Sequence, residues 1–155
     1  MPKSFSSTKL ATFLAFLVIA VDQSSKWAVL EFLERYRLVR IFPFFNITVV
    51  KNTGISFGVF SETVHPIILI LVSTAVAVSL VLWTSNNIHY RLPTVLITSG
   101  AIGNILDRIF YGYVVDFLDF HICSYHWPAF NIADAVVVVG AALLVLVTHR
   151  CGDWR

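Results

Sequence analysis

Long apolar stretches separated by shorter polar ones are the dominant pattern of this 155-residue chain. Four stretches are long enough, with their flanks, to cross the hydrocarbon core of a bilayer, which takes roughly 20 helical residues. They are residues 10–30, 66–83, 92–109 and 132–148. The pattern therefore predicts one all-α membrane domain, residues 1–155, built on four transmembrane helices.

Two longer connections, residues 31–63 and 111–130, separate these stretches and carry a different pattern. Residues 47–50 (Ile-Thr-Val-Val) are β-prone, residues 52–54 (Asn-Thr-Gly) are typical of a turn, and residues 56–60 can return as a second strand. The aromatic side chains of these connections suit the membrane interface. A small β-hairpin or β-cradle lying on the membrane is therefore expected beside the helices.

The composition agrees with this membrane assignment. Of all residues, 57% are hydrophobic and only 13% are charged, and the mean hydropathy is +0.80, well above the apolar character of an ordinary soluble domain. The net charge is only +2 and the basic residues are scattered, so no nucleic-acid partner is expected. The chain is expected to be an integral membrane protein with lipids as its immediate partners.

The distribution of lysine and arginine predicts the orientation. With four crossings both termini lie on one side of the membrane, and the positive-inside rule places them in the cytoplasm. The two longer connections are then extracytoplasmic, and loops of this kind often carry function. Basic residues then inside are Lys3, Lys9, Arg91, Arg150 and Arg155, whereas Arg35, Arg37, Arg40 and Lys51 fall in the opposite loop.

Two aspartates occupy positions where lipid makes a carboxylate costly, and such residues mark functional sites. Asp116 lies between Val115 and Phe117, whose apolar side chains favour a protonated carboxyl group. Asn131 is a natural N-cap, which places Asp134 in the first turn of the last helix, where the helix dipole favours the charged form. If the fold brings the two acids together, one can act as acid and the other as base.

The loop after Asp116 holds a second group of polar side chains. Asp119 is the rival to Asp116, because the two would lie one turn apart if this stretch were helical. Asp119, His121, Cys123 and His126 crowd into eight residues and could in principle hold zinc. Short loops seldom supply tetrahedral geometry alone, so neither a metal nor another cofactor is expected.

Polar residues also interrupt the first and third apolar stretches. Asn104 and Arg108 are four residues apart and share a helix face, where they can brace a carboxylate or pack against a neighbouring helix. Asp22 and Lys26 have the same spacing and are expected to form a structural ion pair. A proton relay is the alternative for that pair.

Several short motifs follow one another from the first apolar stretch to the fourth. They are residues 22–26, residues 52–54 (Asn-Thr-Gly) with Phe57-Gly58, residues 103–108 (Gly-Asn-Ile-Leu-Asp-Arg), residues 114–117 (Val-Val-Asp-Phe) and residues 130–134 (Phe-Asn-Ile-Ala-Asp). In order and spacing this set resembles that of bacterial lipoprotein signal peptidase, also called signal peptidase II. The resemblance covers nearly the whole chain.

This resemblance implies an aspartyl endopeptidase of the bacterial inner membrane with a small extracytoplasmic β-cradle. Its substrates would be prolipoproteins whose cysteine carries diacylglycerol, cut before that cysteine with neither a metal nor a covalent intermediate. A monomer is expected. By the resemblance Asp116 and Asp134 are the catalytic dyad, Asn52, Gly54, Asn104, Arg108 and Asn131 line or brace the site, and Asp22 and Lys26 belong to a motif of the first span.

Two other classes of protein fit part of the sequence. A proton-coupled transporter also carries intramembrane Asp, Arg and Asn. In such a transporter, however, two halves of the chain would show polar breaks at corresponding positions. Residues 66–83 carry no charge, so the halves do not correspond. If the chain were a structural membrane subunit, the acidic pair would have no function.

Overall fold

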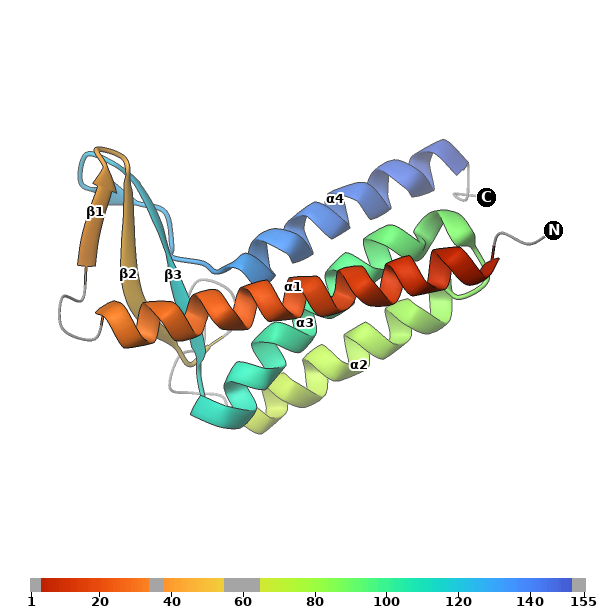
Figure 1. Cartoon of the computed structure of the whole chain (residues 1–155), viewed down its shortest axis with the longest axis horizontal. Helices are drawn as coiled ribbons and strands as arrows, with labels where there is room; N and C mark the ends of the chain where they lie inside the picture. The colour runs from red at the N-terminus through yellow and green to blue at the C-terminus, as the bar shows by residue number, and fades with distance from the viewer. Residues whose placement is uncertain (1–3, 34–37, 55–64, 152–155) are drawn as a thin grey trace.

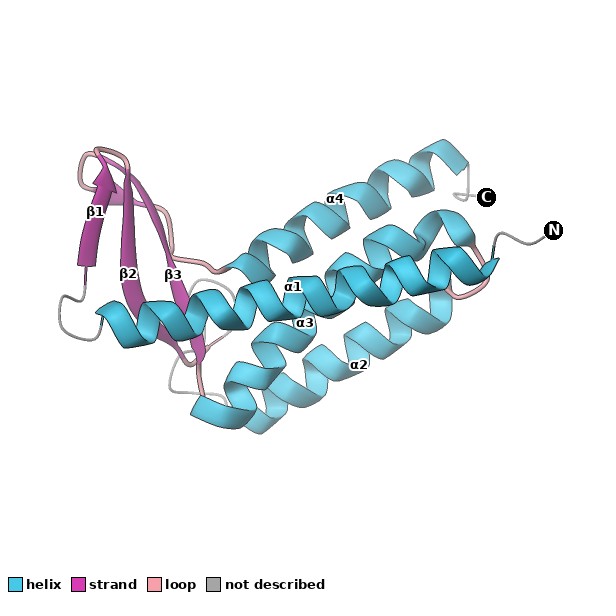
Figure 2. Ribbon diagram, in the orientation of Figure 1, coloured by secondary structure: helices cyan, strands magenta, loops and turns pink. Residues whose placement is uncertain are grey.

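The structure, a computed structural model, describes residues 4–33, 38–54 and 65–151. In chain order the elements are α1 (Ser4–Leu33), β1 (Leu38–Phe42), β2 (Phe45–Asn52), α2 (Pro66–Thr84), the short 3-10 helix η2 (Ile88–Tyr90), α3 (Arg91–Tyr111), β3 (Val114–Ile122), β4 (Tyr125–His126) and α4 (Ile132–Cys151). The sheet lies at one end of the helices, and α1 begins and α4 ends at the opposite end (Figure 1). The chain is mostly helical, as Figure 2 shows by colour.

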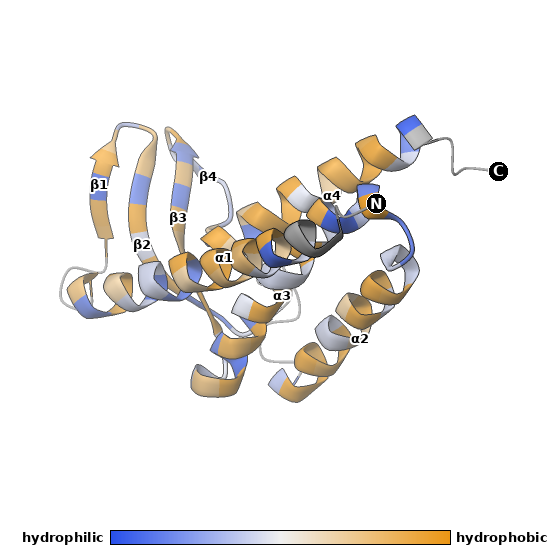
Figure 3. Ribbon diagram, turned by 45° about the vertical axis from the view of Figure 1, so that its right-hand side comes forward, coloured by the Kyte–Doolittle hydropathy of each residue, from blue (hydrophilic) through white to orange (hydrophobic). Residues whose placement is uncertain are grey.

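Each predicted apolar stretch falls within one of the four α-helices of the described residues. By length and composition α1, α2 and α4 can cross a membrane, with spans at Thr8–Leu33, Pro66–Thr84 and Ile132–Arg150. Apolar residues run along these helices in Figure 3. Helix α3 is not among the candidate spans found in the described residues, so the fourth crossing stays a prediction.

Helix α3 is the central helix, because α1, α2 and α4 all pack against it. Glycines allow α3 and α4 to approach closely, as small residues do between membrane helices. A Cβ atom on Gly100 would lie 2.6 Å from the carbonyl oxygen of Ala133, and one on Gly140 would lie 2.8 Å from a side-chain carbon of Ile97. Gly112, with a left-handed φ of 78°, ends α3 and turns the chain into β3.

The long first helix connects the bundle to the sheet. Its 30 residues span about 45 Å at the α-helical rise, more than the roughly 30 Å of a bilayer core. The last turns of α1 therefore lie against the sheet, where Val29 and Leu33 pack with Phe117 of β3 in a small buried core. The sheet is antiparallel throughout, in the order β1-β2-β3-β4.

The expected small sheet is confirmed, but its strands differ from the prediction. Residues 47–50 lie in β2, whose neighbours are β1 and β3, and the predicted return strand at 56–60 lies outside the described residues. The helical placement considered for residues 116–119 is wrong, since they lie in β3. Strand β3 was not predicted. Its first four residues are all buried, so this part lacks the alternation of apolar and polar residues that marks a half-exposed strand.

Candidate active site

Asp116 and Asp134 approach each other because the chain doubles back after β4. The carbonyl oxygen of Phe130 accepts hydrogen bonds from the amides of Phe117 (3.0 Å) and Leu118 (2.8 Å), and the Phe130 amide donates to the Leu118 carbonyl (3.2 Å). This short bridge lays residue 130 alongside β3. The next residue begins the turn into α4, so the start of that helix lies beside Asp116.

Asn131 links the two aspartates directly. Its Oδ1 accepts a hydrogen bond from the Asp134 amide (2.9 Å), and its own amide donates to Asp134 Oδ2 (3.3 Å). This reciprocal pattern is that of a capping box, and it confirms the predicted N-cap. The side-chain Nδ2 of Asn131 donates to Asp116 Oδ1 (2.7 Å). One fully buried side chain therefore contacts both acids.

Two more asparagines complete the surroundings of the acids. Asn52, at the end of β2, donates from Nδ2 to Asp116 Oδ2 (2.9 Å), and Asn104 of α3 donates to Asp134 Oδ1 (2.7 Å). Asn131 Nδ2 also donates to Asn104 Oδ1 (3.1 Å). All four carboxylate oxygens thus accept a hydrogen bond from an asparagine, which holds both acids in fixed orientations.

The surroundings of Asp116 favour its neutral form. Burial raises the pKa of Asp116 to about 7, and the nearby negative charge of Asp134 adds to this effect. Hydrogen bonds from Asn52 and Asn131 and the positive charge of Lys26 act in the opposite direction without cancelling it. The protonated form expected from the apolar neighbours of Asp116 is therefore accessible near neutral pH.

Arg108 fixes the turn at the end of β2. Its guanidinium donates to the carbonyl oxygens of Gly54 (3.0 Å) and Asn104 (3.3 Å), and the Gly54 amide donates to Asn52 Oδ1 (3.0 Å). Among the described residues these bonds go to the main chain, so Arg108 braces the turn that presents Asn52 rather than holding a carboxylate itself. The turn predicted at residues 52–54 is present.

A cavity of about 680 Å³ opens beside the two acids. Asp116 and Asp134 contribute to its polar side, and its walls are mainly apolar side chains from α2, α4 and the loop before α4. Val72 of α2 and Val138 and Val139 of α4 are 55%, 67% and 53% exposed, so this wall continues onto the outer surface of the bundle. Its lining includes Asn52, Leu69, Val72, Asn104, Arg108, Asp116, Trp127, Asp134, Val138 and Val139.

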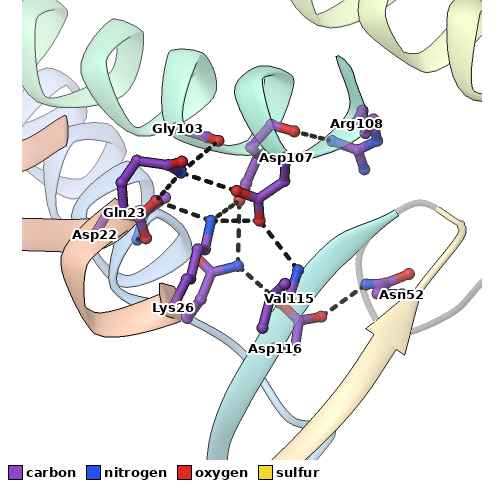
Figure 4. A network of polar contacts seen from close by, with 12 residues as sticks. Asp22, Gln23, Lys26, Asn52, Gly103, Asp107, Arg108, Val115 and Asp116 are labelled. Carbon is purple, nitrogen blue, oxygen red and sulfur yellow. Dashed lines mark hydrogen bonds and ion pairs between the residues drawn. The ribbon is translucent and has the colours of Figure 1, made fainter. Parts of the chain in front are cut away.

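The predicted ion pair of α1 belongs to a larger network behind the acids. Lys26 Nζ lies 2.8 Å from Asp22 Oδ2 and 2.9 Å from Asp107 Oδ2 of α3, and Figure 4 shows the lysine between the two carboxylates. Gln23 adds a hydrogen bond to Asp107 Oδ1 (2.8 Å). Sequence reasoning gave no role to Gln23 or Asp107. The one sequence signal for Asp107 is that it is an acid inside an apolar helix. Its contact with Lys26 could not be predicted, because no spacing rule relates α1 to α3.

Asp119, the rival to Asp116, lies away from the cavity. Asp119 lies three positions after Asp116 in β3, so their side chains point to opposite faces of the sheet. Asp119 accepts hydrogen bonds from Asn46 (2.9 Å) and pairs with His126 (2.8 Å). Burial alone would raise the pKa of Asp119, but these hydrogen bonds lower it below its usual value. Within the described ranges no three His, Cys, Asp or Glu side chains are grouped to hold a metal.

Comparison with known proteins finds similar sequences and a similar solved structure over most of the chain. A family model described as "Signal peptidase (SPase) II" matches residues 14–150. The lipoprotein signal peptidase of Syntrophotalea carbinolica is 38% identical, over 93% of this chain and 96% of that protein, and that of Alteromonas mediterranea is 39% identical, over 99% and 88%. The structure is also similar to a bacterial membrane enzyme solved by the in meso method at 2.3 Å, with a TM-score of 0.81, 26% identity and coverage of 95% and 92% of the two chains.

Proposed function

The chain belongs to the signal peptidase II family, and from that premise we propose that it is an aspartyl endopeptidase acting on prolipoproteins. It removes the signal peptide by cleaving before a cysteine that carries diacylglycerol. The observation that carries the proposal is the pair Asp116 and Asp134, joined through Asn131 at the wall of an apolar cavity. Two acids sharing one polar environment suit the activation of a water molecule.

The proposed reaction divides acid and base between the two aspartates. Asp134, in the first turn of α4, takes a proton from the water that attacks the carbonyl carbon before the cysteine. Asp116, whose pKa is raised to about 7, donates its proton to the carbonyl oxygen as the tetrahedral gem-diol forms. When this intermediate collapses, Asp134 passes the proton taken from water to the leaving amine, and Asp116 takes a proton back from a gem-diol hydroxyl. The pair therefore returns to its starting state with one shared proton.

The cavity supports recognition of the lipid part of the substrate. Acyl chains on the cysteine already lie in lipid, so they move between two apolar surroundings when they enter the cavity, and its apolar walls can receive them without unpaired polar groups. The exposed valines Val72, Val138 and Val139 face the region between α2 and α4, through which a substrate can enter from the bilayer by lateral diffusion.

The proposed topology places this site at the extracytoplasmic face of the bacterial inner membrane, with both termini in the cytoplasm. Helix α3 would be the fourth crossing. Its polar residues Asn104, Asp107 and Arg108 lower its apolar character, but α1, α2 and α4 surround it, so lipid need not solvate those groups. The enzyme is expected to act as a monomer.

The dependence of cleavage on the lipid tests the proposed function. Purified protein is incubated with a synthetic prolipoprotein whose cysteine either carries diacylglycerol or is unmodified. We expect the modified substrate to be cut at least about 100-fold faster, because its acyl chains contribute binding energy that the unmodified peptide lacks. Mass spectrometry should place the cut directly before the cysteine, and a chelator should leave the rate unchanged. Equal cleavage of both peptides, or a cut elsewhere, contradicts the proposal.

The pH dependence of cleavage tests the role of Asp116. A raised pKa means that the carboxyl group keeps its proton up to about pH 7, so an enzyme that needs Asp116 as an acid loses activity as the pH rises through that value. Replacing Asn52 by alanine removes a hydrogen bond that favours the charged form and should move this loss to higher pH. The measurement is kcat/KM against pH. If kcat/KM of Asn52→Ala falls at the same pH as that of the parent enzyme, or at a lower pH, this argues against Asp116 as the acid.

A further inference from the structure

Three charged side chains lie buried behind the two aspartates. Asp22, Lys26 and Asp107, which we call the buried triad, are each at most 1% exposed. They carry a net charge of −1, and removing such groups from water costs several kcal/mol per ion, so buried ion pairs contribute little net stability. Stability alone therefore does not explain a charged cluster at this position.

The two acids of the triad each hold one main-chain amide next to the active site. Asp107 Oδ2 accepts a hydrogen bond from the amide of Val115 (3.0 Å), the residue directly before Asp116. Asp22 Oδ1 accepts a hydrogen bond from the amide of Ala133 (2.8 Å), the residue directly before Asp134. Figure 4 shows the first of these contacts at the start of β3. The same cluster therefore tethers both segments that carry the dyad.

The lysine of the triad provides a third link. Lys26 Nζ donates to Asn104 Oδ1 (3.0 Å), and Asn104 Nδ2 donates to Asp134 Oδ1 (2.7 Å). An ammonium group can only donate, so this contact holds the Asn104 amide with its NH₂ group toward Asp134. The carboxylate of Asp134 is thus fixed from the main chain on one side and from Asn104 on the other.

We propose that the buried triad is a positioning clamp, which sets the separation and orientation of Asp116 and Asp134 through the amides of Val115 and Ala133 and through Asn104. None of the three side chains touches the substrate in this role. The proposal rests on the proposed function, because it assigns these residues to the geometry of the same dyad.

Substitution of Asp107 tests the clamp. Asp107→Ala removes the tether to Val115, and a shift of about 1 Å in Asp116 should lower kcat by about 100-fold with little change in KM, because the apolar cavity is untouched. Asp107→Asn keeps an oxygen that can accept the hydrogen bond from the Val115 amide, so its kcat should fall less. Cleavage of the diacylglyceryl-modified prolipoprotein is measured per folded molecule, with the melting temperature recorded in parallel.

The matched control is Asp119→Asn, which neutralises another buried acid of the same region that does not line the cavity. If Asp107→Ala and Asp119→Asn both keep the parent kcat per folded molecule, the triad is only structural and the clamp is wrong. A selective loss of kcat in Asp107→Ala supports it.

A second variant, in which all three triad side chains are uncharged, keeps the clamp testable if Asp107→Ala does not fold. The triple variant Asp22→Asn, Lys26→Met, Asp107→Asn leaves no unpaired buried charge, and replacements of this kind are often tolerated. It should fold but lose kcat, because methionine cannot orient Asn104. Parent kcat per folded molecule overturns the clamp, and a loss of kcat at an unchanged KM supports it.

Asp116→Asn, assayed in the same experiment, separates the two proposals. If it is inactive while the triad variants cleave at the parent rate, the clamp fails and the proposed function stands. If Asp116→Asn cleaves normally, the proposed function itself fails, and the clamp fails with it because there is no dyad to position.

Discussion

Replacing either Asp116 or Asp134 by asparagine is expected to lower the cleavage rate of a diacylglyceryl-modified prolipoprotein by about 10⁴-fold. Asparagine has nearly the same size and can keep part of the hydrogen bonding from Asn131, but it cannot exchange a proton near neutral pH. Because the two acids act as one unit, the double variant should be hardly worse than either single one. Steady-state kinetics on the purified proteins give both comparisons.

The control for this result is Asp119→Asn. Asp119 is a buried acid on the opposite face of β3, where it pairs with His126, so its neutralisation should leave kcat near the parent value. The melting temperatures of all variants show whether any loss of rate reflects unfolding. Parent-like cleavage by folded Asp116→Asn or Asp134→Asn would contradict the assignment of the dyad.

The second large effect is expected for Asn131→Ala, with a fall in kcat of about 10²–10³-fold. This side chain contacts both acids and Asn104, so its truncation releases Asp116 and Asp134 together. The loss of the N-cap should also reduce the free energy of unfolding by about 1 kcal/mol. Kinetics and thermal denaturation measure the two effects separately.

Asn46→Ala is the matched control for Asn131→Ala. Asn46 is also buried, at 3% exposure, and its side chain donates to an aspartate, but that aspartate is Asp119. Its truncation should destabilise the sheet without a specific loss of kcat. If Asn131→Ala lowers kcat per folded molecule no more than Asn46→Ala does, then Asn131 serves only the fold.

The helices and the local geometry around them could be predicted from the sequence alone. Apolar length places each predicted stretch inside an observed helix, because a helix satisfies its own backbone and needs only an apolar surface to lie in lipid. The Asn131 cap, the turn at residues 52–54 and the Asp22–Lys26 pair follow from spacings within one element. Short-range rules apply to such contacts, and no partner from elsewhere in the chain is needed.

The assembly of the site, in contrast, depends on contacts between distant segments that appear only in the folded chain. The first four residues of β3 are all buried, so the sequence there lacks the alternation that would reveal the strand holding Asp116. The contacts of Asp107 to Lys26 and Val115, and of Asp22 to Ala133, join segments that no sequence period relates. Packing of α1, α3 and α4 at their glycine contacts brings these groups within hydrogen-bond distance, and the long-range geometry that results depends on all of the helices at once.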